Sequence, residues 1–357
     1  MNGEWRDFLE SEGARIDDDS ARFEPGGLGE CNLFDLSHLG LIRVSGEDAE
    51  TFLQGQFTND VRALTPDHSQ LSSYCSPKGR MLAGFRLFRF GGDICIQLPR
   101  PRLPAVLQRL RMFVLRSKAT LEDASDSLVQ TGLSGECAFA MLGDLAPPAA
   151  DEVIQENGLC IVRLAGDRPR FLLTGLPDRI RELWRHASHR ARPANPETWR
   201  LLDIRAGIPS IHEETVEAFV PQMINLQLIN GVSFTKGCYT GQEIVARMQY
   251  LGKLKRRMYR VRLDTATCPL PGDELVSPDS ESGQGAGRIV TAAPAPDGGC
   301  EALAVVEISV ADAGDVRLGD SAGPALEFLD LPYRFAEPEQ TASEHRLFPS
   351  GFRGCQG

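Results

Sequence analysis

The segment FTKGCYTGQE, residues 234–243, places a cysteine among residues that could activate it. Lys236 lies two residues before Cys238, and Gly237 between them permits a turn that would expose the sulfur. A nearby cation lowers the pKa of a thiol and favours the thiolate, which is the reactive form. Free cysteines are otherwise among the most buried residues, but the neighbours of Cys238 are not a hydrophobic run. We therefore predict a reactive thiolate at Cys238, with Lys236 as its electrostatic partner.

The residues after the cysteine have the form of a capping box. In this motif the hydroxyl of Thr240 accepts a hydrogen bond from the amide of Glu243, whose carboxylate reaches back to the amide of residue 240. The pattern predicts a helix that begins at Gly241 and ends at Gly252. Cys238 would then lie two residues outside the cap, near the positive end of the helix dipole, which also favours the thiolate.

The composition is that of a globular protein, since 42% of the 357 residues are hydrophobic and 24% are charged. No apolar run approaches the length of about 18 residues that spans a bilayer. The first twenty residues are acidic, where a targeting peptide would be basic. The nine cysteines are scattered, with no C-x-x-C and no cysteine–histidine cluster at zinc spacing. We expect reduced thiols, a cytoplasmic location and no metal site.

The charge distribution bears on possible partners. A net charge of −11 argues against a nucleic-acid-binding protein, because a polyanion requires a basic surface. Residues 236–262 are an exception, with eight lysines and arginines against one acid. This run is either a solvated face or a pocket for an anionic ligand or partner, and charge alone does not decide between them.

Two parts of the chain, about one hundred residues apart, show a similar predicted order of strand, helix, hairpin and helix. The first contains a strand at 39–45, a helix within 46–57, a hairpin around Gly91-Gly92 and a helix with Leu103, Val106, Leu107 and Leu110 in phase. The second contains AFAML, a hairpin around Gly166-Asp167 and a helix at 177–188. The order predicts two α+β subdomains, although no residue-level repeat is visible.

From about residue 256 the chain changes to short β runs separated by loops rich in Pro, Gly and Asp, which predicts a small antiparallel barrel or sandwich. The predicted fold is α+β. Two α+β subdomains occupy residues 1–245, a C-terminal antiparallel β-barrel occupies 250–335, and 336–357 form a loosely ordered tail.

The sequence KGCYTGQEIVAR, preceded by AGIPSI and FVPQMINLQLINGVSF, resembles the signature of the YgfZ family of folate-binding proteins. These are relatives of the glycine-cleavage T-protein, an aminomethyltransferase, and support assembly or repair of iron–sulfur clusters. FDLSHLGLIRVSGEDAETFLQGQFTNDV looks like the opening that both branches share. The resemblance covers about residues 30–335. It implies a T-protein-like region of two α+β subdomains and a β-barrel around a central opening that holds tetrahydrofolate.

Departures from the T-protein pattern argue against ordinary aminomethyl transfer. Where T-proteins carry an aspartate pair, this chain reads KGRMLAGFRLF, with Ala83 and Gly84 at those positions. No carboxylate is then available there to steer a proton. Arg205 stands where T-proteins tend to have a glutamate, and it could meet the glutamate tail of the folate. T-proteins lack a cysteine at the position of Cys238.

The resemblance implies a monomeric, cytoplasmic protein that binds tetrahydrofolate, with or without a polyglutamate tail. Its clients would be iron–sulfur enzymes, including tRNA-modifying ones, without direct contact with nucleic acid or membrane. The residues expected to form the folate site are Tyr239, Gln242 and Glu243 beside the thiol, and Thr58, Asn59, Lys78 and Arg205 in the pocket.

Other readings of these residues stay open. Residues 58–60 could be a helix-ending turn, and Lys78 an exposed hairpin residue. The rival functions are a folate-dependent one-carbon transferase and a non-catalytic folate-binding scaffold.

Overall fold

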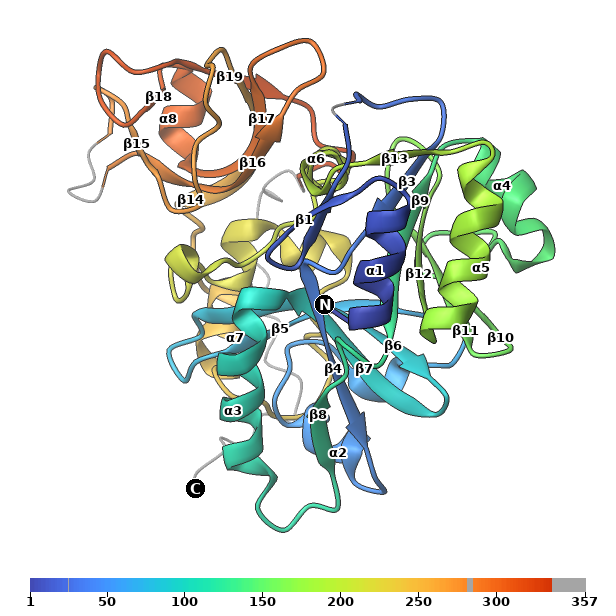
Figure 1. Ribbon diagram of the computed structural model, residues 1–357. Helices are drawn as coiled ribbons and strands as arrows, with labels where there is room; N and C mark the ends of the chain where they lie inside the picture. Colours follow the sequence, from blue (N-terminus) through green and yellow to red (C-terminus); the bar gives the residue numbers. More distant parts are fainter. Residues whose placement is uncertain (25, 281–284, 336–357) are drawn as a thin grey trace.

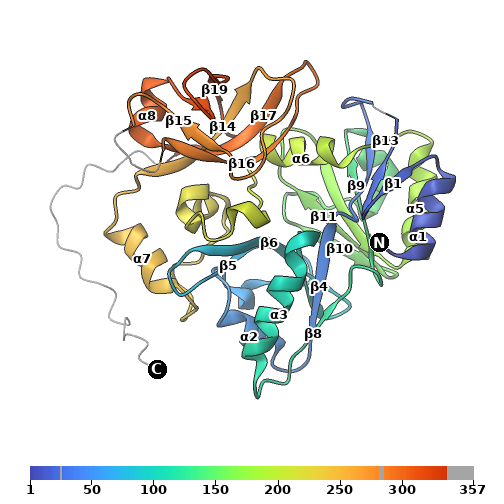
Figure 2. The same ribbon diagram turned by 60° about the vertical axis from the view of Figure 1, so that its left-hand side comes forward.

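The computed structural model describes residues 1–24, 26–280 and 285–335. The described chain forms two α+β subdomains and a C-terminal β-rich unit, which meet around a middle segment of helices and short helical turns (Figure 1). Figure 2 shows this middle segment between the C-terminal unit and the first subdomain. The predicted tail at 336–357 lies outside the described residues.

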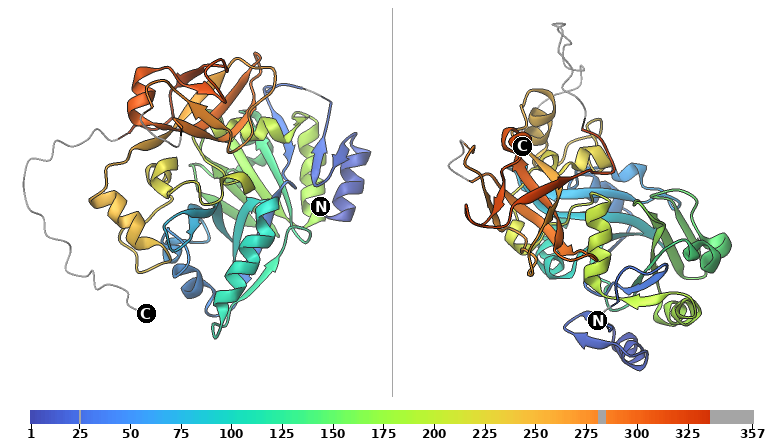
Figure 3. Two further views of the ribbon diagram at one scale, coloured as in Figure 1. Left: turned by 90° about the vertical axis from the view of Figure 1, so that its left-hand side faces the viewer. Right: turned by 90° about the horizontal axis from the view of Figure 1, so that it is seen from above.

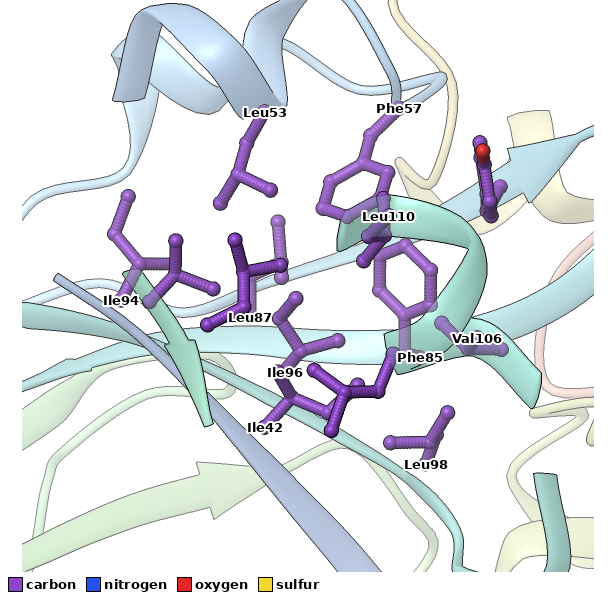
Figure 4. Close-up of a cluster of buried hydrophobic side chains, with 14 of the residues drawn as sticks. Ile42, Leu53, Phe57, Phe85, Leu87, Ile94, Ile96, Leu98, Val106 and Leu110 are labelled. Atoms are coloured by element: carbon purple, nitrogen blue, oxygen red, sulfur yellow. The ribbon is translucent and has the colours of Figure 1, made fainter. Parts of the chain in front are cut away.

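The first subdomain is an antiparallel sheet with two helices on one face. Its sheet order is β5-β6-β7-β4-β8. Apolar side chains from α2 and α3 meet those of the sheet in a single core, which includes Leu53, Phe85, Ile96 and Leu110 (Figure 4). Its elements are β4 (Leu39–Ser45), α2 (Ala49–Gln54), η1 (Val61–Ala63), β5 (Gln70–Cys75), β6 (Met81–Phe90), β7 (Asp93–Pro99), η2 (Arg100–Arg102), α3 (Leu103–Val114) and β8 (Thr120–Asp123).

The second subdomain repeats this order of elements, which confirms the predicted pair of α+β units. Its sheet order is β10-β11-β12-β9-β3-β13. Its elements are β9 (Val129–Ser134), α4 (Cys137–Leu142), η3 (Gly143–Leu145), β10 (Val153–Glu156), β11 (Leu159–Leu164), β12 (Arg170–Gly175), α5 (Pro177–Ser188) and β13 (Arg192–Ala194).

The N-terminal residues belong to this second subdomain. Strand β3 (Asn32–Asp35) pairs with β9 and β13, and helix α1 (Gly3–Ser11) lies against α5 (Figure 3). Between them, β1 (Arg15–Asp17) and β2 (Ser20–Arg22) form a hairpin. Trp5 of α1 and Trp184 of α5 meet edge to face, with ring centroids 5.5 Å apart.

The C-terminal unit is an antiparallel sheet, in the order β18-β15-β16-β17-β14-β19, that curls into a half-barrel (Figure 1). This confirms the predicted β-rich architecture. Its elements are β14 (Arg256–Leu263), β15 (Glu274–Val276), β16 (Gly287–Pro294), β17 (Cys300–Glu307), α8 (Ile308–Ala313), β18 (Arg317–Leu318) and β19 (Leu326–Leu329). The middle segment contains α6 (Pro196–Arg205), η4 (Glu213–Thr215), η5 (Pro221–Ile224), η6 (Leu226–Ile229) and α7 (Gln242–Tyr250).

The prediction that the cysteines are reduced thiols is wrong for part of the set. Cys31 is disulfide-bonded to Cys137, 106 residues away, and Cys268 to Cys300, 32 residues away. Cys238 is also disulfide-bonded, so the thiolate considered below concerns the reduced protein. Such pairs are not visible in the sequence because the fold brings distant residues together.

A buried carboxylate fastens the half-barrel to α6. The guanidinium of Arg205 donates to Oε1 of Glu301 over 3.0 and 2.6 Å, and that of Arg260 donates to Oε2 over 3.0 and 2.8 Å. Burial raises the pKa of Glu301, but hydrogen bonds from the two arginines outweigh it, so the pKa lies below its usual value. Arg205 was expected in the folate pocket; its guanidinium instead binds a carboxylate of this chain.

Replacing this carboxylate should weaken the whole assembly. In Glu301→Gln, two arginines lose their shared counter-ion, and removing one partner of a buried ion pair costs about 3–5 kcal/mol. We expect a loss of that size in the free energy of unfolding, measured by urea denaturation at pH 7. Glu327→Gln, at an exposed position on β19, is the matched control, with an expected change below about 0.5 kcal/mol.

The same variant should change the response to acid. Because the pKa of Glu301 is lower in the folded than in the unfolded protein, its contribution to stability is present above the unfolded pKa and is lost as the pH falls through the folded pKa. Stability of the wild type should therefore fall more steeply in acid than that of Glu301→Gln. Equal slopes would contradict this role.

Candidate functional site

Lys236 is buried, and its ammonium group donates hydrogen bonds to the backbone of residues 54–59. The side chain is 7% exposed. Its Nζ donates to the carbonyl oxygens of Gln54 at 2.7 Å, Phe57 at 2.6 Å and Asn59 at 2.9 Å. An ammonium group has three donors, so all three are satisfied. Lys236 thus ties the segment of Cys238 to the turn that follows α2.

The electrostatic surroundings of Lys236 differ from the predicted pairing with Cys238. Burial lowers the pKa of Lys236 to about 8, an effect that Asp60 opposes and Arg62 reinforces. The ring of Tyr239 lies 5.1 Å from Nζ and adds a cation–π contact. Within the described chain the ammonium therefore meets carbonyls and an aromatic ring, and its role is to position the segment.

Thr58 and Asn59 belong to the same cluster of contacts. The hydroxyl of Thr58 donates to the carbonyl of Gly231 at 2.9 Å. The side-chain amide of Asn59 donates to the carbonyls of Leu71 at 2.8 Å and Asn230 at 2.7 Å. The structure thus brings Lys236, Thr58 and Asn59 together. Their side chains hold the backbone of residues 54–59, of β5 and of residues 230–236 in place.

Cys238 is exposed and precedes α7 at a greater distance than predicted. The helix begins at Gln242, and its N-cap is Gly241, with φ +83° and no side-chain hydrogen bond at the cap. The predicted capping box is wrong, because Gly241 and not Thr240 occupies the cap. Cys238 lies three residues before this N-cap. The influence of a helix dipole falls off within about one turn, so it favours the thiolate less than the predicted placement would.

The other residues predicted near the thiol serve local structure. Oε1 of Gln242 accepts from the amide of Tyr239 at 3.3 Å. Glu243 is exposed and pairs with Arg247, one turn later, at 2.8 Å. Tyr239 is buried, and burial, with Cys75 nearby, raises the pKa of its phenol.

Lys78 lies on an exposed turn that packs against the start of α7. Gly79 has φ +66°, and a Cβ there would lie 2.8 Å from Cβ of Ile244. A Cβ on Gly241 would collide with the carbonyl of Ser76. These two glycines allow the turn to approach the helix closely, which explains why the cap is a glycine. Lys78 itself remains exposed.

A central cavity of about 640 Å³ lies between the subdomains. Its lining comes from β5, β6, the turn before α4, the loop before β10, the turn between β11 and β12, the end of α6, the end of η6 and residues 332–333. None of the nine predicted site residues lines it. Asn59 nevertheless holds two lining residues, Leu71 and Asn230, by their carbonyls.

The cavity contains charged groups of both signs. Arg163 donates to the carbonyl of Pro148, and Arg168 donates to the carbonyls of Gly29 at 3.0 Å and Glu30 at 2.7 Å. Within the described residues, neither guanidinium forms an ion pair with a carboxylate. These groups can therefore receive the anionic part of a ligand.

Acidic side chains also line the cavity. Asp151 pairs with Arg86, whereas Glu136 and Asp167 are exposed and can accept hydrogen bonds from a ligand. Sequence reasoning missed this set because each segment contributes only a few residues. The hairpin turn predicted at Gly166-Asp167 was the one visible signal.

The described residues hold neither a cluster of metal ligands nor a membrane-spanning helix. No group of three or more His, Cys, Asp or Glu residues there could hold a metal ion. Likewise, no helix among those residues combines the length and apolar character needed to cross a membrane.

Removing the ammonium of Lys236 should destabilise the protein. In Lys236→Met, three carbonyls lose their donor, and each unsatisfied buried polar group costs about 1–3 kcal/mol. We expect the free energy of unfolding to fall by about 3 kcal/mol or more, with faster hydrogen exchange in residues 54–60. Lys253→Met changes an exposed lysine in the same basic run and serves as control. A similar small effect of both variants would show that the three contacts do not stabilise the fold.

Comparison with known proteins agrees with this architecture. The family described as GCVT N-terminal domain matches residues 29–155. The glycine cleavage system aminomethyltransferase T from Bartonella henselae has a similar solved structure, with a TM-score of 0.65 over 85% of this chain and 86% of that chain. At 17% identity, that likeness shows the fold alone.

Sequence relatives are more specific. The tRNA-modifying protein YgfZ of Yersinia pestis (strain Pestoides F) is 32% identical over 308 residues, which cover 85% of this chain and 93% of the relative. The protein of the same name from Colwellia psychrerythraea is 33% identical over 314 residues, which cover 86% and 94%. At this identity and coverage, the chain belongs to the YgfZ family.

Proposed function

We propose that this chain binds tetrahydrofolate in its central cavity and supports the assembly or repair of iron–sulfur enzymes through Cys238. The observation that carries the proposal is a cavity between the subdomains of a T-protein-like fold, lined by two guanidinium groups that pair with no carboxylate among the described residues. The relatives are named tRNA-modifying proteins, so we place tRNA-modifying iron–sulfur enzymes among the clients. We also propose that this protein acts in the cytoplasm, together with these client enzymes.

The cavity suits a folate in size and chemistry. Its volume of about 640 Å³ lies within the range of about 300–1,000 Å³ typical of small-molecule sites. Arg163 and Arg168 can pair with the carboxylates of the glutamate tail, whether it has one glutamate or several. Glu136 and Asp167 can accept from the N–H groups of the pterin.

A short series of contacts links the cavity to the segment of Cys238. Asn59 holds Leu71 and Asn230 at the cavity wall, and its own carbonyl accepts from Lys236. Lys236 is two residues from Cys238, which is exposed and which, once its disulfide is reduced, is within reach of another protein. A ligand that orders the cavity wall would therefore also order the approach to the thiol.

Two positions on β6, Ala83 and Gly84, argue against aminomethyl transfer. Ala83 is 1% exposed and belongs to the apolar core of the first subdomain. A Cβ on Gly84 would meet Met81 and Ile211 at 3.4 and 3.8 Å. Neither position carries a carboxylate, so the acid that T-proteins use is missing from this strand.

Folate binding should depend on the guanidinium groups of the cavity. In Arg163→Met, we expect the dissociation constant for 5-formyltetrahydrofolate, measured by calorimetry, to rise about tenfold, equal to about 1.4 kcal/mol. The rise in the dissociation constant should be larger for a triglutamate form, because its additional carboxylates can also pair with the guanidinium group. Arg190→Met, at an exposed position outside the cavity, should bind as the wild type does. No binding by the wild type would refute the folate assignment.

The thiol should be required in cells. In a strain that lacks this protein, we would measure the activity of a [4Fe–4S] tRNA-modifying enzyme under oxidative stress, with rescue by wild type or Cys238→Ser. We expect rescue by the wild type alone, with both proteins at equal level and with equal folate affinity. Equal rescue would favour the scaffold alternative. Turnover of a methylated amine with folate as acceptor would favour the transferase.

A further inference from the structure

The chain after the last strand of the half-barrel returns to the central cavity. Pro332 and Tyr333 line the cavity, although they follow β19 by only a few residues. The hydroxyl of Tyr333 donates to the carbonyl of Gly207 at 3.0 Å and accepts from Nδ2 of Asn225 at 3.4 Å. Burial raises the pKa of Tyr333 to about 12, which the hydrogen bond with Asn225 opposes. The hydroxyl is therefore a neutral donor at physiological pH.

The position of this tyrosine is built by the residues around it. Gly207 has φ +65°, and a Cβ there would lie 2.6 Å from Cε1 of Tyr333, so only glycine lets the ring lie against the chain at the end of α6. Asn225 is fully buried, has a left-handed backbone and also donates to the carbonyl of Met258 at 2.8 Å. The ring is thus held by partners on two separate segments.

The same short segment is anchored at its other end. The guanidinium of Arg257 lies 4.1 Å from the ring centroid of Phe335, and the ring of Tyr259 lies 5.6 Å from it. Both partners belong to β14 of the half-barrel. Residues 330–335 therefore form a strap fixed to the half-barrel at Phe335 and to the middle segment at Tyr333.

We propose that Tyr333 is a ligand-positioning residue of the central cavity, so that the half-barrel supplies one wall of the binding site. This inference rests on the proposed folate binding. A planar aromatic ligand in the cavity would lie against a ring whose hydroxyl is fixed to Gly207. Ligand binding and docking of the half-barrel then stabilise each other, because the ligand contacts both units.

The test separates the hydroxyl from the ring. Tyr333→Phe keeps the ring and removes both hydrogen bonds, and Tyr333→Ala also removes the wall. Dissociation of 5-formyltetrahydrofolate, followed by stopped flow, should be about tenfold faster in Tyr333→Phe and faster still in Tyr333→Ala. The thermal midpoint of ligand-free Tyr333→Phe should stay close to that of the wild type. Tyr250→Phe removes an exposed hydroxyl on α7, outside the cavity, and should leave the dissociation rate unchanged.

Failure of this inference can be told apart from failure of the folate assignment. If the wild type binds folate and Tyr333→Phe releases it at the rate of Tyr250→Phe, the positioning role is overturned and the folate assignment stands. If the wild type binds no folate, hydrogen exchange is compared between ligand-free wild type and ligand-free Tyr333→Phe. Faster exchange at residues 206–208 in the variant supports Tyr333 as a wall of the cavity. Unchanged exchange there overturns it.

Discussion

The buried ammonium of Lys236 is the constraint on which the arrangement of the site depends. A charge removed from water is costly unless it is fully hydrogen-bonded, and here the acceptors are three carbonyls from one turn, residues 54–59. The turn must hold its shape to present them, and the segment of Cys238 must stay against it. Asn59, within that turn, in turn fixes two points of the cavity wall. The side chain of Lys236 thus fixes the position of the exposed Cys238 relative to the cavity wall, although the two belong to different segments of the chain.

Much of the fold could be predicted because its signals are local. The strand predicted at 39–45 has those bounds in the structure, and the hairpin at Gly91-Gly92 is present between β6 and β7, since apolar alternation and turn glycines depend on neighbouring residues alone. The start of α7 was misplaced for a tertiary reason. Thr240 and Glu243 have the right spacing for a capping box, but the close turn at Gly79 requires a glycine at the cap.

The site was less predictable than the fold because its residues act across long separations. The sequence predicts that Arg205 meets a ligand, yet its carboxylate partner is Glu301, 96 residues further along the chain. The cavity poses the same difficulty, since its wall combines single residues from both subdomains, the middle segment and the end of the half-barrel. The motif around Cys238 therefore indicated the family and the exposed sulfur, whereas the arrangement of charges that could hold a ligand emerged only from the fold.

The position of β3 has a consequence for synthesis on the ribosome. This strand, residues 32–35, is made before any of the first subdomain, yet it pairs with β9 and with β13, which ends at Ala194. Loop closure over such separations is slow, and domains tend to fold as units while the chain emerges. The intervening subdomain, residues 39–123, contains all its own strands and can fold while β3 waits. The N-terminal hairpin and α1 must then remain undocked until roughly half the protein has been made.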